Sequence, residues 1–595
     1  MIARSHLSRM LLLAWAWSGC RSGSAIESEP LDRGDPIGGQ SQTALATPLP
    51  ILLDQGWDQR TREAFWFTPQ GSQVMPYSWF LSLERADSQE LVRASANMER
   101  YRYISMPPSE LNPDALPIGF VRDVDVESRT ASLGLTCAAC HTAKISLNGR
   151  DVIIDGGPTL SDFKAFLRDT VEALAATRRD PSKFQRFAAS VLPVDAGDAE
   201  RAELRQALSV QHDALAVRLA FDGTEVEPGY GRLDAFGGIL NNVAATGLGL
   251  PANAAPQDAP VSYPFVWDAP QADRVQWNGS ALNAPLVGAL TRNIGEVLGV
   301  FGRLELDPKL AKLRGYSNSV NLPNLGRLEN WLRELSSPRW PRELLPAIDG
   351  TLASAGEQLY GEHCASCHER IDARDPARKI AAKMVPVPEV GTDPTMARNY
   401  LDRKGKTGKL EGKRAMILGG ERFGAETRTF QIVANGVAGV LLDNPLESLA
   451  VALGDLNHVR KLRKEAPMPT PRVDDAARAM AELKRTIGLF ALFDPDTYHY
   501  KARPLNGVWA TAPYLHNGSV PSLWDLLQTP AQRPKAFHVG SRSFDAKKMG
   551  MSTAAEPGTS LLDTGLHGNS NAGHLYGTQL SEAQKWQLIE YVKTL

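Results

Sequence analysis

The sequence has few cysteines, no excess of charge of either sign and no long apolar run after its first residues. Only five cysteines occur in 595 residues, a number too small and too odd for a disulfide framework. Lys and Arg number 65 against 67 Asp and Glu, so the net charge of −2 argues against a nucleic-acid-binding protein. The 43% of hydrophobic and 22% of charged residues are ordinary for a globular protein. A chain of this length predicts roughly two to four domains.

The first residues resemble an export signal. A basic segment precedes eight uninterrupted apolar residues at 10–17, which are too few to span a bilayer. The small pair before Cys20 is similar to the lipid-attachment site of bacterial lipoproteins, although Trp17 departs from that pattern. We therefore predict a lipoprotein-like signal peptide at 1–20 and a flexible tether at 21–47. The protein would be exported to the periplasm, cell envelope or medium, with a lipid on Cys20 as membrane anchor or, alternatively, cleavage near Cys20 without lipid.

The mature chain divides at a proline-rich stretch near residue 345. We predict an N-terminal domain at 48–345 and a C-terminal domain at 346–595. Capping-box patterns at Ser354–Glu357 and Ser581–Gln584 predict a helix at each end of the second domain, and the two helices are expected to pack together. Strand signals are few and short, with Val152–Ile154 as one of them.

The four remaining cysteines form two C-x-x-C-H motifs, and this spacing suits covalent haem attachment. The two thiols would add to the haem vinyl groups, and the histidine would bind the iron. Structural zinc is the rival, but its cysteine pairs are typically about 15–20 residues apart, whereas these start at 137 and 364. The predicted cofactors are therefore two covalently bound haem c groups. Their binding residues are Cys137, Cys140 and His141 in the first motif, and Cys364, Cys367 and His368 in the second.

The second axial ligand of each iron is not fixed by the spacing. An iron that only transfers electrons usually has two strong ligands, whereas one that binds O₂ or peroxide keeps one position open. Prolines on both sides of Met468 make it the better of two methionine candidates. The candidates are His516, His567, His574, Met416 and Met468.

Several longer segments resemble the di-haem cytochrome c peroxidase superfamily, and within it the rubber oxygenase branch of latex-clearing di-haem dioxygenases. They are GYGRLDAFG (229–237), PFVWDAPQADRVQWNGS (264–279), RNIGEVLGVFG (292–302), YKARPLNGVWATAPYLHNGSVPSLWDLL (500–527) and GNSNAGHLYGTQL (568–580). The long interval between the haem motifs is similar to the extended first half of rubber oxygenases.

This resemblance implies a mainly α fold of two cytochrome-c-like haem domains with extended loops and a few short strands. The haem on His141 would be the reactive one, and the haem on His368 would handle electrons. In the rubber oxygenase branch two histidines hold the second haem, so His574 is expected opposite His368, with His516 as the next choice. Some relatives also hold a calcium ion between the domains.

The resemblance also suggests aromatic residues between the haems and three alternative functions. Trp277, as a catalytic residue with His141, and Trp267 are the aromatic candidates. The first function is O₂-dependent cleavage of polyisoprene or another apolar substrate. The second is H₂O₂ reduction with electrons from a small electron-transfer protein, and the third is electron transfer without catalysis. The candidate acid–base residues for peroxide reduction are Glu225, Glu227, Arg232 and Asp234.

Overall fold

The structure is a computed structural model that describes residues 50–125, 128–220, 226–283, 288–309, 315–415, 417, 420–466 and 497–595. The predicted signal peptide, tether and Cys20 lie outside the described residues, as do Met416, Met468 and Glu225. Of the described residues, 39% are helical and 15% are in strands. Within the described residues the strands form two three-stranded and six two-stranded sheets. The prediction of a mainly α fold of two cytochrome-c-like domains is therefore wrong.

The physical reason lies in the first half, where the first C-x-x-C-H motif joins two sheets. The sheet before the motif has the strand order β2-β4-β3, and the sheet after it has the order β1-β6-β5. All pairings are antiparallel except that of β1 with β6. The strands are β1 (Ile51–Leu52), β2 (Met75–Pro76), β3 (Phe120–Val124), β4 (Ala131–Leu135), β5 (Thr142–Leu147) and β6 (Arg150–Asp155). The strand predicted at Val152–Ile154 is confirmed as part of β6, whereas β1 and β2, with two residues each, are too short to show a pattern in the sequence.

The other strands form small two-stranded pairs. They are β7 (Arg232–Leu233) with β8 (Val261–Ser262), β9 (Arg274–Val275) with β10 (Ala281–Leu282), β11 (Lys383–Pro386) with β14 (His499–Ala502), β12 (Lys404–Lys406) with β13 (Glu426–Arg428), β15 (Ala536–Val539) with β18 (Ser560–Asp563), and β16 (Phe544–Asp545) with β17 (Gly550–Met551). The pairing of β7 with β8 and of β11 with β14 joins segments that lie far apart in the sequence.

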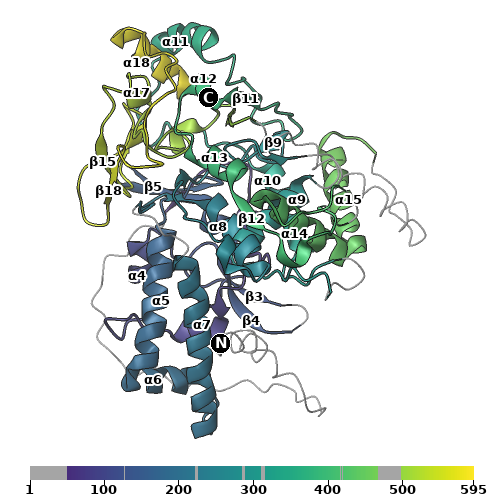
Figure 1. Cartoon of the computed structure of the whole chain (residues 1–595). Coiled ribbons are helices and arrows are strands. Elements are labelled where there is room, and N and C mark those ends of the chain that lie inside the picture. The colour runs from purple at the N-terminus through teal and green to yellow at the C-terminus, as the bar shows by residue number, and fades with distance from the viewer. Residues whose placement is uncertain are drawn as a thin grey trace, which may run out of the picture.

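Three helices, α5, α6 and α7, extend from the rest of the molecule at the bottom of Figure 1. The Asp162 side chain caps α5 by accepting a hydrogen bond from the Ala165 N–H, and Asp180 caps α6, which begins with a proline. Helices α2 and α3 contact strands of the sheet before the motif. The helices of the first half are α2 (Gln59–Phe67), α3 (Tyr77–Ser82), α4 (Ser95–Arg100), α5 (Phe163–Arg179), α6 (Pro181–Val191), α7 (Asp198–Ala220), α8 (Ala235–Asn241), α9 (Gly288–Gly299) and α10 (Leu322–Glu334).

Helices of the second half lie against helices of the first. Helix α14 (Thr429–Asp443) contacts α9, and α15 (Pro445–Leu462) contacts α10, where Arg333 Nε lies 2.8 Å from Asp455 Oδ1. One buried core includes Trp66 from the first half and Ile589 from the second. Across the described residues no single helix has the length and hydropathy of a membrane span; α14 and α15 reach them only as a pair bent by 96°.

The second half carries the helix pair that the capping patterns predicted. Helices α11 (Gly350–His363) and α18 (Glu582–Val592) pack against each other, at the top of Figure 1. The capping box of Ser581 and Gln584 is confirmed, whereas α11 begins five residues earlier than predicted, with Asp349 and not Ser354 as its cap. A Cβ on Gly356 would lie 2.0 Å from the Gln587 carbonyl oxygen, so glycine allows this close approach.

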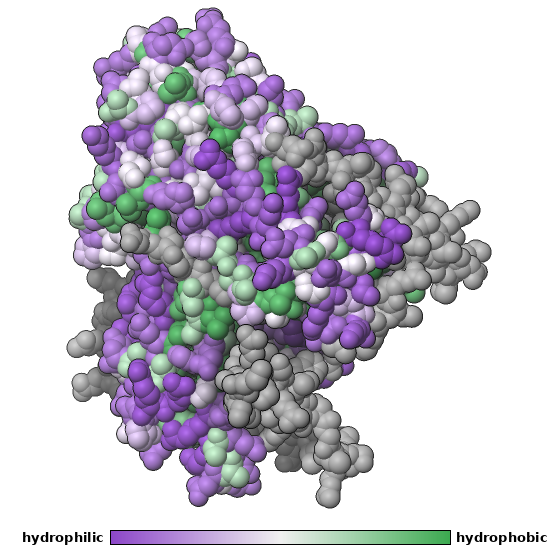
Figure 2. All heavy atoms as spheres, in the orientation of Figure 1, coloured by the Kyte–Doolittle hydropathy of each residue, from purple (hydrophilic) through white to green (hydrophobic). Residues whose placement is uncertain are grey.

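The short helices of this half are α12 (Val387–Val390), α13 (Thr395–Asp402) and α17 (Leu523–Leu526). The face in Figure 2 is largely hydrophilic, with small hydrophobic patches, one of them over the region of β15 and β18.

Candidate functional site

The second C-x-x-C-H motif follows directly after α11. The His368 N–H donates to the Cys364 carbonyl oxygen at 2.9 Å, which closes the motif into a turn. His368 Nδ1 lies 2.7 Å from the carbonyl oxygen of Arg503. Donation from Nδ1 to a carbonyl fixes the tautomer and leaves Nε2 free to bind a metal.

His574 lies opposite His368. The two ring centroids are 6.3 Å apart, at an interplanar angle of 45°. Two imidazoles bound to one iron through bonds of about 2 Å would place their centroids about 6 Å apart. The buried Nδ1 of His574 has no hydrogen-bond partner within the described part of the chain, and the Tyr576 ring packs edge-on against the imidazole at 5.2 Å. The residues present therefore fit a haem iron with two histidine ligands.

The backbone around His574 is held firmly in place. The Arg533 guanidinium donates to the carbonyl oxygens of Asn571, Gly573 and His574 at 2.5, 2.9 and 3.1 Å. The His574 N–H donates to the Val390 carbonyl oxygen at 2.7 Å. Burial, with the neighbouring His368 and Arg533, lowers the pKa of His574 to about 3. Its imidazole therefore stays neutral, which is the form that binds iron.

A cavity of about 220 Å³ lies between these groups, and its wall includes Cys364, Cys367, His368 and His574. Burial raises the pKa of the Cys364 thiol to about 11, which disfavours a reactive thiolate. No group of three or more His, Cys, Asp or Glu side chains in the described ranges is arranged to hold a metal ion, such as zinc or calcium.

The other predicted histidine ligands lie differently. His516 also lines the cavity, but its ring stacks on Tyr500 at 4.1 Å and makes no ring contact with His368. Burial lowers the pKa of His516 to about 4. His567 is exposed, with its Nε2 3.3 Å from Asp258 Oδ2. Of the three histidines, only His574 faces His368.

The first motif occupies a single turn of 3₁₀-helix between β4 and β5. Thr136 caps this turn by accepting a hydrogen bond from the Ala138 N–H, and His141 Nδ1 lies 2.8 Å from the Pro264 carbonyl oxygen. Burial and the charge of Glu296 raise the pKa of Cys137 to about 12. The Pro264 carbonyl orients the His141 ring in the same way as the Arg503 carbonyl orients the His368 ring.

The first histidine has no second imidazole opposite it among the described residues, but a carboxylate lies near. Burial lowers the pKa of His141, and the negative charge of Glu296 on α9 acts in the opposite direction. Gln276 Nε2 donates to Glu296 Oε1 at 2.6 Å. Glu296 also lines two cavities of about 160 and 120 Å³ with largely apolar walls. Nothing in the sequence singles out Glu296, although it lies within the segment RNIGEVLGVFG.

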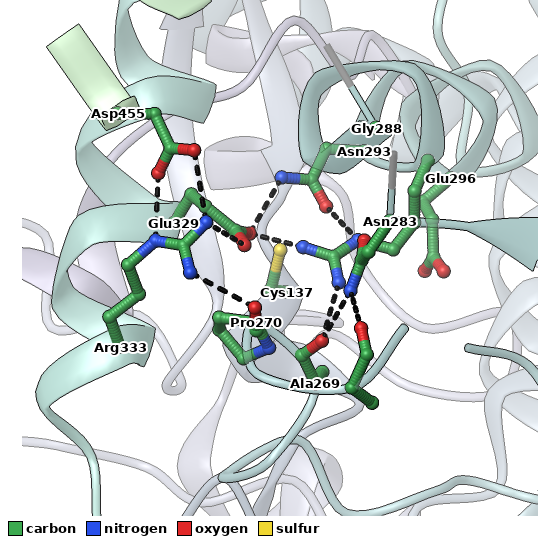
Figure 3. Close-up of polar contacts among 12 residues, drawn as sticks. Cys137, Ala269, Pro270, Asn283, Gly288, Asn293, Glu296, Glu329, Arg333 and Asp455 are labelled. Carbon is green, nitrogen blue, oxygen red and sulfur yellow. Dashed lines mark hydrogen bonds and ion pairs between the residues drawn. The ribbon is translucent and has the colours of Figure 1, made fainter. Parts of the chain in front are cut away.

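A buried ion network lies beside Cys137 (Figure 3). Glu329 forms an ion pair with Arg292 and lies 3.7 Å from Arg333, which pairs with Asp455. Against the effect of burial, the charges of Arg292 and Arg333 lower the pKa of Glu329. This network joins α9, α10 and α15 behind the first motif.

Both predicted tryptophans contact residues 501–506. Trp267 is fully buried, stacks on Phe265 at 4.4 Å and donates from Nε1 to the Asn506 carbonyl oxygen. Trp277 lines the cavity of the second motif and donates from Nε1 to the Ser262 carbonyl oxygen at 2.9 Å. The guanidinium of Arg503 lies 3.7 Å from the Phe265 ring centroid and 4.6 Å from that of Trp277.

Three of the predicted acid–base residues have structural partners. Glu227 pairs with Arg168 at 2.8 Å near the surface. Arg232 donates to Asn569 Oδ1 at 2.8 Å, and Asp234 caps α8 through the Gly237 N–H at 2.8 Å.

Comparison with known proteins connects this geometry to a family. The chain is 32% identical over 591 residues to a protein of Sinorhizobium fredii (strain NBRC 101917 / NGR234) named "Uncharacterized protein y4iJ", covering 91% of this chain and 93% of that protein. The chain belongs to the y4iJ family. A second protein of that strain, "Uncharacterized protein y4iM", is 26% identical over 395 residues, 62% of this chain and 72% of its own length.

Residues 499–538 match the family described as RoxA-like, cytochrome c-like. This match connects the chain to RoxA-like cytochromes and to haem. The matched segment includes Lys501, Arg503 and His516, which line the cavity of the second motif.

Proposed function

We propose that this protein is a two-haem c-type oxidoreductase in which the haem on Cys137 and Cys140 reacts with O₂ or peroxide. The haem on Cys364 and Cys367 would carry electrons. The observation that supports this division is the asymmetry of the sites: His574 faces His368, whereas His141 has no such partner among the described residues. An iron with two imidazoles suits electron transfer, and an iron with one leaves a position for a small molecule.

A haem at the first motif would supply the chemistry of O₂ or peroxide activation. The chain itself would orient His141 through Pro264, and the apolar walls of the two cavities would exclude water around Glu296. Glu296 is oriented by Gln276, and its negative charge acts on His141. Its carboxylate would accept and return a proton.

Two reactions remain as candidates. The largely apolar cavity between α8, α9 and α14 favours O₂-dependent cleavage of polyisoprene or another apolar substrate. Glu296 favours peroxide reduction, with electrons delivered to the second haem by a small electron-transfer protein. A cytochrome without catalysis would need both irons to have two strong ligands.

The test uses the purified protein with both haems. Imidazole and H₂O₂ should alter the absorption of one haem and leave that of the other unchanged. Turnover of peroxide with a reduced donor, or release of carbonyl fragments from polyisoprene under O₂, would then select the reaction. Indifference of both haems to O₂, H₂O₂ and imidazole would refute the enzyme proposal.

The proposal includes export, with Cys20 as the site of lipid attachment. Labelled fatty acid should be incorporated into the full chain and lost in Cys20→Ala. A labelled Cys20→Ala protein, or an unlabelled wild-type protein in the envelope, would contradict lipid attachment at this residue.

A further inference from the structure

Two basic side chains line the cavity of the second motif, and their hydrogen-bond partners are backbone carbonyls. Arg503 Nη1 donates to the Phe265 carbonyl oxygen at 3.2 Å, and Lys501 Nζ donates to the Arg274 carbonyl oxygen at 3.0 Å. In the described part of the chain neither side chain forms an ion pair with a carboxylate. The charges of Asp268 and Asp273 act on these cations without pairing with them, and Asp268 forms its ion pair with Arg378. A largely buried cation without a paired carboxylate is costly, so this wall is suited to an anionic ligand.

Burial has a measurable consequence for both groups. It lowers the pKa of Lys501 to about 7 and that of Arg503 to about 10, and the positive charge of Arg503 lowers the pKa of Lys501 further. A pair of negative groups beside them would remove this penalty.

Arg503 also lies between the two motifs. Its carbonyl oxygen holds the His368 ring, while its guanidinium stacks on Phe265 and Trp277. Phe265 directly follows Pro264, whose carbonyl oxygen holds the His141 ring. The positive charge of Arg503 therefore acts on both axial histidines.

We infer that Arg503 and Lys501 form a carboxylate-binding subsite for the two propionate groups of the second haem. The propionate edge of this haem then faces the first motif, and Arg503 lies on the path between the two sites. The inference rests on haem binding at the second motif, which is part of the proposed function. It goes further by assigning the orientation of that haem in the cavity.

The test measures the midpoint potential of the low-spin haem by spectroelectrochemical titration, together with the propionate bands in its resonance Raman spectrum. Arg503→Gln and Lys501→Gln should each lower the midpoint potential and shift the propionate bands, because loss of a nearby cation favours the oxidised iron. Arg503→Lys should retain most of the potential. Arg218→Gln is the matched control, since the Arg218 guanidinium also stacks on an aromatic ring, that of Phe301 at 4.0 Å, but lies outside this cavity; it should leave both readouts unchanged.

An intact low-spin haem with wild-type potential and propionate bands in Arg503→Gln and Lys501→Gln would overturn the inference. An equal shift in Arg503→Lys and Arg503→Gln would also overturn it, because stacking and not charge would then be responsible. If the Arg503→Gln protein does not incorporate haem, the Lys501→Gln protein tests the inference instead, because no contact of Lys501 holds a histidine that would bind iron. Absence of haem from the second motif in the wild type would instead refute the proposed function.

Discussion

In both C-x-x-C-H sites a distant backbone carbonyl lies against the histidine Nδ1, at 2.8 Å for His141 and 2.7 Å for His368. The surroundings then differ. The second motif follows a helix and has His574 opposite it, whereas the first joins two sheets and has Glu296 nearby. If both motifs attach haem as proposed, the C-x-x-C-H motif alone does not decide the chemistry of each site; the residue supplied by a remote segment does.

The largest expected effect is loss of one haem. The double variant Cys364→Ala/Cys367→Ala should lose the low-spin haem, and Cys137→Ala/Cys140→Ala should lose the reactive one, because each thioether needs its thiol. Intact mass and haem content per chain measure the loss. Ser366→Ala, at an exposed position within the second motif, is the control and should retain both haems. Retention of both haems in either double variant would contradict the division into two sites.

The next effect concerns the carboxylate that distinguishes the first site. Glu296→Gln keeps the shape of the side chain but replaces the proton-accepting carboxylate with a neutral amide. The rate of the peroxide reaction should fall by about 10² to 10⁴ fold, while the spectrum of the second haem stays unchanged. Stopped-flow mixing with H₂O₂ measures the rate. The control Glu227→Gln changes an exposed carboxylate that pairs with Arg168, and this protein should react at the wild-type rate. Equal rates in the wild type and both variants would show that Glu296 takes no part in the reaction.

The two sites should also differ in what stabilises them. The sheet beside the first motif contains Asp155, which accepts hydrogen bonds from Arg62 Nε at 2.5 Å and from Trp66 Nε1 at 2.9 Å. Asp155→Ala leaves a buried, unpaired arginine and should lower the free energy of unfolding by about 3–5 kcal/mol in urea titrations. The control Asp151→Ala removes a partly exposed partner of Lys144 and should cost about 0–1 kcal/mol. Similar costs for the two variants would argue against the buried pair.

The smallest effect is expected where α11 meets α18 beside the second motif. Gly356→Ala forces a Cβ against the Gln587 backbone and should cost about 1–3 kcal/mol. Gly350→Ala, in the same helix with open space at its Cβ, should be neutral or slightly stabilising. Thermal unfolding followed by absorption of the low-spin haem compares them. A neutral Gly356→Ala would show that the two helices can separate without cost.

The sequence predicted part of this arrangement because some signals are local. Capping by Ser581 and the order of Cys364, Cys367 and His368 can be read from adjacent residues. The sheets around the first motif could not, because their shortest strands, such as β1, span two residues and depend on partners distant in the chain. Glu296 and Arg503 were missed for a similar reason: a charged residue in an apolar segment acquires its role only when folding brings it to a cavity.

The central claim is that one iron has two histidine ligands and the other has one. Electron paramagnetic resonance of the oxidised wild-type protein tests it most directly, in parallel with His574→Ala and His516→Ala. We expect one low-spin and one high-spin signal in the wild type. His574→Ala should convert the low-spin signal, added imidazole should restore it, and His516→Ala should leave it unchanged. Two low-spin signals in the wild type, or an unchanged low-spin signal in His574→Ala, would contradict the account.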